Sequence, residues 1–357
     1  MAKMTRREFL RNLALGTSAA AMNQFLAACG QSLETLMPTG TAKATWTKAL
    51  VPTETRQSPT STHAEGGELA PQATTEPAPE PSPTPPGSPD LVVARGGEPE
   101  ELVRHAMAAL GGMDQVVSMG ADVIIKPNIC IAYHTYEFAA TTNPWVVAAL
   151  VKLCFEAGAS RVRVMDYPFG GTPEQAYNVS GIAEQVAVAG GEMAFMPGFK
   201  YVATEIPKGR DVHKVEIFDD ILTTDVLIDV PIAKHHSLAK LTLGMKNLLG
   251  VIKNRSAMHR NLGQRLADLT SLVMPDLTVV DAVRMLMDHG PTGGNMADVK
   301  NMDTVIVSRD IVAADSFAAT LFGMQPDNLD YIRAGAEMGL GTSKLDELRI
   351  EEVSANA

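Results

Sequence analysis

Residues 224–252 read TDVLIDVPIAKHHSLAKLTLGMKNLLGVI. The aliphatic run at the start of this stretch is typical of a buried strand in a parallel sheet. Lys234, His235 and His236 follow it, and Lys246 then lies within a segment that is otherwise apolar. Because ligands bind beyond the carboxyl ends of such strands, this pattern predicts a polar site at one edge of a sheet.

The apolar segment at residues 241–252 is predicted to be a helix. Its apolar residues recur at helical spacing and would form one face: Leu241, Met245, Leu248 and Ile252. Lys246 and Asn247 lie off this face, as they would on a half-buried helix whose lysine reaches solvent. The cationic residues 234–236 just before the helix favour instead a lysine that faces a site.

Strand-like and helix-like segments alternate on both sides of this stretch. Strands are predicted at residues 91–95, 121–127, 161–166, 215–218, 224–231, 276–283 and 303–308. Helices are predicted at residues 99–112, 143–159, 182–191 and 311–323. Short β-branched runs separated by helices indicate a layered α/β fold, with a largely parallel mixed sheet and helices on both faces. We expect residues 91–357 to form a single domain of this kind.

Charged or amide side chains follow five of the predicted strands. They are Lys126 with Asn128, Asp166, Asp229 with the 234–236 group, Asp281, and Arg309 with Asp310. One such ending carries little information, because every strand has to meet water somewhere. Five of them favour a shared cleft at the carboxyl edge of the sheet.

Lysines and neutral imidazoles at a strand end suit a small anion such as a carboxylate, a phosphate or an enolate-like intermediate. The candidate catalytic residues are His235, His236, Lys246 and Lys126, with one of the histidines as general acid or base. The candidate substrate-binding residues are Lys234, Asn128, Asn247 and Ser237. The substrate and the reaction stay open.

A divalent metal is one cofactor that this site would admit, with Asp166 and Asp229 as its candidate ligands. Adjacent histidines point in different directions on a strand, so a site with both histidines on one metal is disfavoured. His235 paired with Asp166 or Asp229 is the more plausible arrangement. The chain has no iron–sulfur cysteine motif.

Two loops are open to interpretation. His259, in the segment NRSAMHRN, either closes over the site or is solvated, and DHGPTGGN at residues 288–295 is interpreted as a plain connection. The chain carries no Walker A motif, no GxGxxG after its first strand, no HExxH and no GxSxG. The sequence therefore offers no anchor for the usual nucleotide, zinc-protease or serine-hydrolase functions.

Residues 1–28 are predicted to be a twin-arginine lipoprotein signal peptide. Arg6 and Arg7 precede a modest apolar stretch, which is short for a membrane span. LAAC at residues 26–29 resembles a lipobox, so Cys29 is the predicted lipidation site. We expect export by the twin-arginine machinery to a bacterial cell envelope, where the lipid alone anchors the protein to the outer face of the membrane.

Residues 29–90 are predicted to be a disordered stalk rich in Pro, Thr, Ser and Glu. This segment holds 11 of the 22 prolines of the chain and shows no apolar periodicity. Such a composition does not bury enough surface to offset the entropy lost on ordering. The segment would hold the folded domain away from the membrane.

Charge and cysteine content exclude several classes of protein. The formal net charge is −11, which argues against nucleic acid and against a polybasic membrane patch. Besides Cys29 the chain has only Cys130 and Cys154, too few for a disulfide scaffold. The two would be able to pair in an oxidising compartment, although the helical context of Cys154 favours a buried, inert thiol.

Several segments resemble the domain-of-unknown-function family 362. They are IIKPNIC at 124–130, VRVMD at 162–166, PIAKHHSLAKLTLGMKNLLGVI at 231–252, DLTVVDAV at 276–283, HGPTGG at 289–294 and SRDIVAADSFAATLFG at 308–323. The resemblance extends from about Leu91 to Val353. Matching positions include Lys126, Asn128, Lys234, Thr242, Lys246, Asn247, Gly250, Asp281, Pro291, Asp310 and Asp315, with either His235 or His236 at the histidine position. The resemblance implies no activity, and the ferredoxin-like cysteines of some relatives are missing here.

Two classes of function fit the sequence. One is an exported enzyme that acts on a small anionic substrate, with the lysines holding the anion and a histidine moving a proton. The other is a lipid-anchored binding protein for a solute or a cofactor, in which the same cations hold the ligand without turnover. The residues leave open whether the protein is an enzyme.

Overall fold

A computed structural model describes residues 87–356 of the chain. The predicted signal peptide, the lipidation site Cys29 and nearly all of the predicted stalk lie outside the described residues. Within residues 87–356, no helix is long and apolar enough to cross a membrane.

The central feature is a sheet of ten strands. Eight of them lie side by side in the order β12 (Ile350–Ser354), β1 (Leu91–Arg95), β11 (Val299–Ser308), β10 (Leu277–Leu286), β7 (Val226–Val230), β2 (Asp122–Pro127), β3 (Arg161–Val164) and β4 (Glu192–Met193). Along this row, β11 alone runs antiparallel to its two neighbours. Beside β10 lies β8 (Ile232–His236), which pairs with β9 (Lys240–Thr242). The predicted sheet, largely parallel and mixed, is confirmed.

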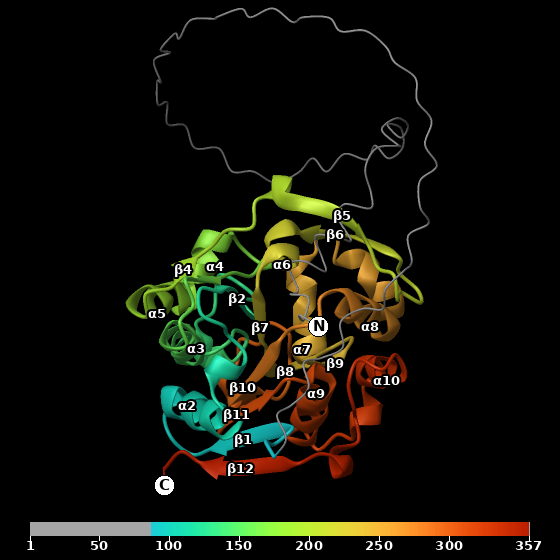
Figure 1. Ribbon diagram of the computed structural model, residues 1–357. Coiled ribbons are helices and arrows are strands. Elements are labelled where there is room, and N and C mark those ends of the chain that lie inside the picture. Colours follow the sequence, from blue (N-terminus) through green and yellow to red (C-terminus); the bar gives the residue numbers. More distant parts are fainter. Residues whose placement is uncertain (1–86, 357) are drawn as a thin grey trace, which may run out of the picture. The chain divides into compact units, whose positions relative to one another are not determined.

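Helices cover both faces of the sheet, as predicted (Figure 1). One face carries α2 (Pro99–Ala109), α3 (Pro144–Glu156), α4 (Pro173–Val179) and α5 (Ile182–Val188). The other face carries α6 (Asp219–Thr223), α7 (Gly244–Asn247), α8 (Leu262–Leu272), α9 (Ile311–Thr320) and α10 (Asp330–Glu337). Alternate residues of each strand supply the two cores, because successive side chains point to opposite faces. Thus Val92 packs with α2 and α3, whereas Val93 packs in the core that holds α8 and α9.

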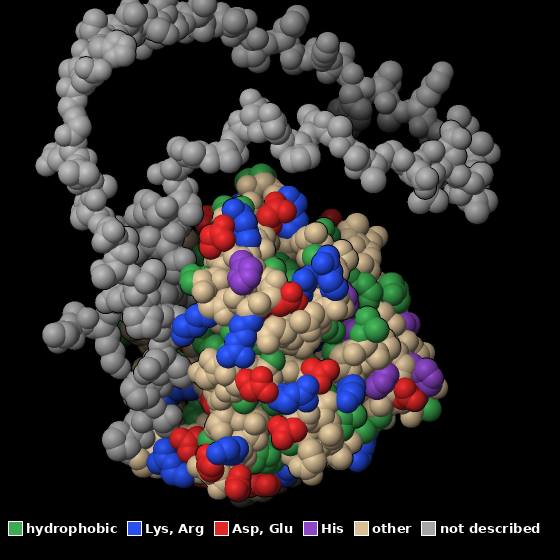
Figure 2. Space-filling model, turned by 90° about the vertical axis from the view of Figure 1, so that its right-hand side faces the viewer, with side chains coloured by type: hydrophobic (Ala, Val, Ile, Leu, Met, Phe, Trp, Pro, Cys, Tyr) green, Lys and Arg blue, Asp and Glu red, His purple; other side chains and the backbone are tan. Residues whose placement is uncertain are grey.

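A second, two-stranded sheet joins β5 (Tyr201–Glu205) to β6 (Lys214–Phe218) in antiparallel register. Figure 2 looks at the face that carries α8 and α10, and there acidic and basic side chains are intermixed. The two cysteines within the described residues, Cys130 and Cys154, are both buried and unpaired. The interpretation of Cys154 as a buried thiol of α3 is confirmed.

The prediction that polar residues after five strands share one edge of the sheet is correct for three of the strands and wrong for two. Asp281 lies in the middle of β10, which continues to Leu286, and its carboxylate accepts hydrogen bonds from the backbone N–H groups of Asn143 and Val283. Arg309 and Asp310 follow β11, which runs against its neighbours, so they lie at the opposite edge of the sheet. Asp310 there caps α9, because its side chain accepts a hydrogen bond from the backbone of Ala313.

The prediction of one helix over residues 241–252 is wrong, because only a short part of this segment is helical. The chain forms the short strand β9, one helical turn in α7, and a 3₁₀ turn at Leu248–Val251. The apolar residues of this segment are buried on all sides, so their spacing reflects a core position rather than one helix face. Gly244 and Gly250 bound the short helical part, and both pack against carboxylates of neighbouring elements.

Candidate functional site

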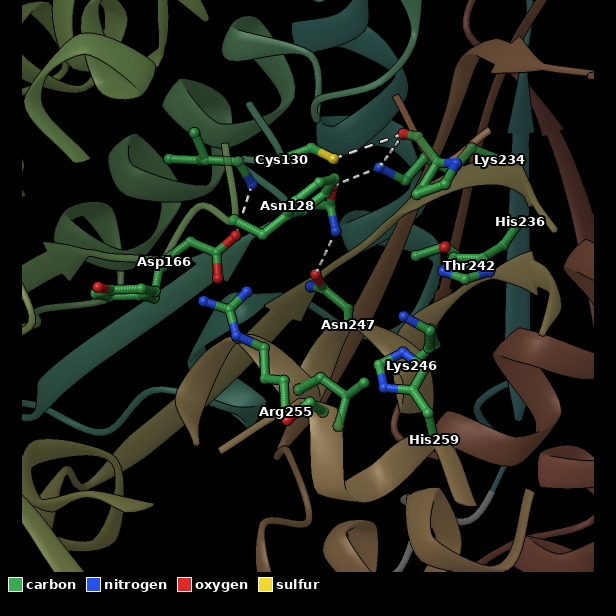
Figure 3. Close-up of a pocket in the computed structure, with 17 residues that line it drawn as sticks. Asn128, Cys130, Asp166, Lys234, His236, Thr242, Lys246, Asn247, Arg255 and His259 are labelled. Carbon is green, nitrogen blue, oxygen red and sulfur yellow. Dashed lines mark hydrogen bonds between the residues drawn. The ribbon is translucent and has the colours of Figure 1, made fainter. Parts of the chain in front are cut away.

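A cavity of about 340 Å³ opens where the carboxyl ends of β2, β3 and β8 meet α7. Its wall comes from five segments: the loop after β2, the loop after β3, the stretch from β8 to α7, residues 249–259, and Pro291 of the loop after β10. Figure 3 shows Asn128 and Cys130 on one side of this cavity and Lys246 and His259 on another. Segments far apart in the sequence therefore contribute to one hollow at the predicted edge.

A buried ion pair lies below the cavity. The Lys126 ammonium group is 2.9 Å from Asp166 Oδ1, and both side chains are almost fully buried. Lys126 also donates to the Asn247 side-chain oxygen at 3.1 Å and to the Pro127 carbonyl at 3.0 Å. An ammonium group has three hydrogens to donate, so Lys126 has no donor left for a ligand. The structure thus places Lys126 beneath the cavity as a support for its wall.

Asn247 connects this ion pair to two strands. Its side-chain oxygen accepts from Lys126 and, at 3.0 Å, from Asn128, while its amide nitrogen donates at 2.8 Å to Asp229 Oδ1. Complete burial raises the pKa of Asp229 well above its ordinary value, with the Lys126 charge acting in the opposite direction. Asn128 and Asn247 both line the cavity, and their role in substrate binding stays a prediction from sequence.

Gly250 allows the chain to pass over the ion pair. A Cβ atom on this residue would collide with Asp166 Oδ1 and would lie 2.7 Å from the Lys126 ammonium nitrogen. The residue is glycine here because of this close approach rather than because of an unusual backbone angle. The ion pair and the backbone above it therefore form one packed unit.

Asp315 of α9 fixes the start of α7. Its two carboxylate oxygens accept hydrogen bonds from the backbone N–H groups of Gly244 at 2.6 Å and Met245 at 2.9 Å. Such a carboxylate replaces the partners that the first N–H groups of a helix lack. Burial raises the pKa of Asp315 to about 7, and these two hydrogen bonds oppose the rise. In this way a turn of only four residues, Gly244–Asn247, holds Lys246 at the cavity wall.

Lys234 is buried at the cavity wall and has no carboxylate partner within residues 87–356. Its ammonium group donates to three neutral oxygens: Asn128 Oδ1 at 2.9 Å, the Ala140 carbonyl at 2.7 Å and the Pro291 carbonyl at 3.0 Å. Burial lowers the pKa of Lys234 from its ordinary value. The positive charge is therefore hydrogen-bonded but not neutralised, which leaves the cavity electropositive at this point.

Lys246 also faces the cavity, and it has fewer hydrogen-bond partners than Lys234. Its side chain is mostly buried, and among the described residues it has no hydrogen-bond or ion-pair partner. Burial, followed by the charge of Lys234, lowers its pKa to about 8. The hydroxyl oxygen of Thr242, also at the cavity wall, is buried and likewise unpartnered within the described residues. A cation and a hydroxyl group that have no partner among the described residues therefore line the same cavity.

The two histidines differ because successive residues of β8 point to opposite sides. His236 lines the cavity, and its Nδ1 accepts hydrogen bonds from the backbone N–H groups of Leu238 at 3.1 Å and Ala239 at 3.2 Å. A neutral imidazole with Nδ1 as acceptor carries its proton on Nε2. Burial and the charge of Lys246 lower the pKa of His236 to about 3, so the ring stays neutral near neutral pH.

His235 lies outside the cavity wall. Its Nδ1 accepts a hydrogen bond from the Gly290 backbone at 3.1 Å, and its Nε2 is 4.0 Å from Asp288. The expected pairing of His235 with Asp166 or Asp229 is therefore wrong, because β8 turns this side chain toward the 288–295 loop. Ser237 is exposed and also lies outside the wall.

The two candidate metal ligands have other partners. Asp166 is engaged by Lys126 and by the backbone N–H of Ile129, and Asp229 by Asn247. Across residues 87–356, no group of three or more His, Cys, Asp or Glu side chains is gathered as a metal would require. The Lys126 ammonium, which pairs with Asp166 and acts electrostatically on Asp229, further disfavours a divalent cation. Metal binding by Asp166 and Asp229 stays a prediction from sequence.

Several cavity residues were missing from the predicted site. Arg255 lies over the ring of Tyr167, 5.0 Å from its centroid, and donates to the Pro168 carbonyl, so it contributes a third cation at the wall. His259 is exposed and also lines the cavity, so both of its interpretations stay open. Cys130 is a further wall residue. A cysteine two residues beyond a strand-end asparagine was the available signal for it.

Fold and site together define a layered α/β protein with a cation-lined cavity at the carboxyl edge of its sheet. The chain belongs to the family described as Domain of unknown function (DUF362), which matches residues 123–320. It is 25% identical over 253 residues to the Thylakoid-associated protein sll1697 of Synechocystis sp., and the match covers 67% of this chain and 74% of that protein.

The chain also matches part of a solved structure. The lactate racemase apoprotein from Thermoanaerobacterium thermosaccharolyticum matches with a TM-score of 0.39 and 11% sequence identity. The match covers 60% of this chain and 53% of the racemase chain, so this protein spans about half of that one.

Proposed function

We propose that this protein is an enzyme that acts on a small organic anion held in the cavity. One observation carries the proposal: Lys246 faces the cavity, mostly buried, with no partner among the described residues. Partial burial of an ammonium group costs free energy that a bound anion would recover. Lys234 and Arg255 add positive charge at the same wall, and neither has a carboxylate partner in the described part of the chain, which supports an anionic ligand.

The chemistry would be proton transfer. A lysine whose pKa is about 8 is partly neutral near physiological pH, so the neutral fraction of Lys246 would accept a proton and return it while Lys234 and Arg255 hold the anion. Neutral His236 would donate a hydrogen bond from Nε2 to an oxygen of the bound anion, where negative charge develops during the reaction. Lys126 and Asp166 would support the wall that carries these groups.

The location that we propose is the outer face of a bacterial membrane, with Cys29 as the lipid anchor. The twin-arginine pattern at Arg6 and Arg7 and the LAAC sequence support this location. A relative named as thylakoid-associated supports a place at a membrane.

Hydrogen exchange tests this function across many candidate substrates at once. An enzyme that removes and returns a proton next to a carboxylate exchanges that hydrogen for deuterium in heavy water. We expect the full chain to exchange at least one member of a panel of small 2-hydroxy, 2-oxo and 2-amino carboxylates, followed by proton NMR. The variants Lys246→Met and His236→Gln should lose this exchange, and Lys208→Met should keep it, because Lys208 is exposed in the turn after β5.

The same panel separates an enzyme from a binding protein. Calorimetric binding of a carboxylate without exchange would indicate a binding protein that uses the same cations. Failure of every carboxylate and of inorganic phosphate to bind would contradict the proposal as a whole.

A further inference from the structure

Cys130 is a cavity group that the proposed proton transfer leaves unused. It follows β2, its side chain is 5% exposed, and it forms part of the cavity wall. Its sulfur donates a hydrogen bond to the Pro291 carbonyl oxygen, with 3.5 Å between the two atoms. The Lys234 ammonium group donates to the same oxygen at 3.0 Å, so thiol and ammonium converge on one point (Figure 3).

Two positive charges lie within electrostatic range of this sulfur. Negative charge on Cys130 favours the ammonium forms of both Lys234 and Lys246. Both lysines line the cavity that the sulfur borders, so the sulfur lies in an electropositive setting. Thiolates are the nucleophilic form of cysteine, and an electropositive, accessible setting is where reactive cysteines are found.

The surroundings of the sulfur are also built to receive oxygen atoms of a ligand. The Thr242 hydroxyl is buried at the same wall without a partner among the described residues, and its residue is 3% exposed. Lys246 is unpartnered in the same sense. A carboxylate bound to these groups would place its carbon chain in the hollow that the sulfur borders.

Cys154 provides an internal contrast. It is fully buried in α3 among apolar side chains, and burial alone raises its pKa to about 12. No cation or cavity faces it within the described part of the chain. Of these two cysteines, only Cys130 combines access to a cavity with neighbouring positive charge.

We propose that the cavity is a thiol-reactive anion site, in which Cys130 adds to a small carboxylate that carries a conjugated carbon–carbon double bond. The proposal rests on the anion binding assigned above. The sulfur electron pair forms the S–C bond at the carbon remote from the carboxylate, and the π electrons move to the carbon next to it. The thiol proton passes to the Lys246 amine, directly or through water, and is returned to that carbon. No oxidant or reductant is consumed.

Alkylation with a matched pair of reagents tests whether the thiol is reached by anions. Iodoacetate is charged and iodoacetamide is its neutral counterpart, and both replace iodide with the cysteine sulfur. The quantity compared is the ratio of the iodoacetate rate to the iodoacetamide rate at Cys130. We expect this ratio to be at least about tenfold higher in the folded full chain than in the same chain unfolded in urea, because the cations concentrate the anion. Mass spectrometry of the Cys130 peptide gives both rates.

Variants identify the source of the preference. Lys246→Met should remove most of it, and Lys208→Met, with the same change in net charge, should leave it intact. Thr242→Val provides a second test if Lys246→Met folds poorly, and it should reduce the preference in part. Incubation with acrylate should add one acrylate to Cys130 and none to Cys154.

Three results would overturn the proposal, and they separate it from the function on which it rests. If the ratio of the two rates is the same in the folded and the unfolded chain, and carboxylates still bind in calorimetry, the thiol role is contradicted and the anion site is retained. Absence of both preference and binding would remove both. No alkylation of Cys130 by either reagent, or alkylation with no acrylate adduct, would show that the sulfur takes no part in addition.

Discussion

Lys126 and Lys246 belong to one site and have opposite surroundings. Lys126 is fully buried, bonded to Asp166 and to two further oxygens, whereas Lys246 reaches the cavity wall without any partner among the described residues. The difference indicates which lysine supports the structure and which awaits a ligand. A buried charge with all its hydrogen bonds made is part of the packing, and one left open is a candidate for function.

The largest expected effect is on stability, from Lys126→Met. This change leaves Asp166 buried beside an apolar side chain, and loss of one partner of a buried ion pair costs about 3–5 kcal/mol. Urea unfolding followed by circular dichroism measures the loss. The double variant Lys126→Met with Asp166→Asn should recover part of it, because the unpaired charge is gone. A loss below about 1 kcal/mol in the single variant would show that this ion pair contributes no more than a solvent-exposed one.

The next largest effect is expected from Gly250→Ala. The added methyl group meets Asp166 and the Lys126 ammonium, so either the ion pair or the backbone has to move. Overpacking of this kind typically costs about 1–3 kcal/mol. Gly198→Ala is the matched control, since nothing lies within 4 Å of its added carbon. Equal stabilities of the two variants would contradict the packed arrangement described for the ion pair.

For Lys246→Met we expect a gain in stability that depends on pH. The pKa of this lysine falls from an ordinary 10.5 to about 8 in the folded chain. Between these values the unfolded chain holds a proton that the folded chain has released, so stability of the wild type rises with pH across that window. Below pH 8 both states are protonated and the folded state carries the full cost, which for this shift is at most about 3 kcal/mol because the side chain is only partly buried.

The variant should therefore be more stable than the wild type at pH 7, and the difference should shrink toward pH 10. Paired urea titrations at several pH values give this comparison directly. Binding of a carboxylate to the wild type should weaken as the pH rises through about 8, where Lys246 loses its charge. A difference in stability that does not vary with pH would contradict the conclusion that the charge of Lys246 is uncompensated in the folded chain.

The smallest effect is expected from Thr242→Val. The hydroxyl oxygen has no partner among the described residues, so its removal should leave the free energy of unfolding unchanged or raise it by up to about 1 kcal/mol. Carboxylate binding should weaken by a few fold in calorimetry, because one hydrogen-bond donor is lost. A loss of stability above about 2 kcal/mol would show that the hydroxyl is satisfied in the empty cavity.

Much of the fold was predictable because β-branched runs and helix caps are local signals. Asn143 caps α3 and Pro144 is its first residue, which agrees with the predicted start of this helix at residue 143. The direction of β11 was not predictable, since a buried antiparallel strand in the middle of a sheet is as apolar as a parallel one. For that reason Arg309 was assigned to the wrong edge.

Within the site, the sequence indicated which residues gather and not how they pair. Lys126, Asp166 and Asp229 meet because the carboxyl ends of adjacent parallel strands meet. The choice between His235 and His236 depends on the side of β8 that each faces, which one sequence with two adjacent histidines does not specify. The partnership of Asp315 with α7 joins residues about 70 positions apart and follows from tertiary packing alone.

The pKa of Lys246 itself tests the anion site most directly. The rate at which acetic anhydride acetylates each lysine, followed against pH by mass spectrometry, reports the fraction of neutral amine. We predict a midpoint near 8 for Lys246 in the folded chain, and slower acetylation when a bound carboxylate is present. A midpoint near the ordinary value of 10.5 would show that the charge of Lys246 is already compensated, and the proposed anion site would lose its basis.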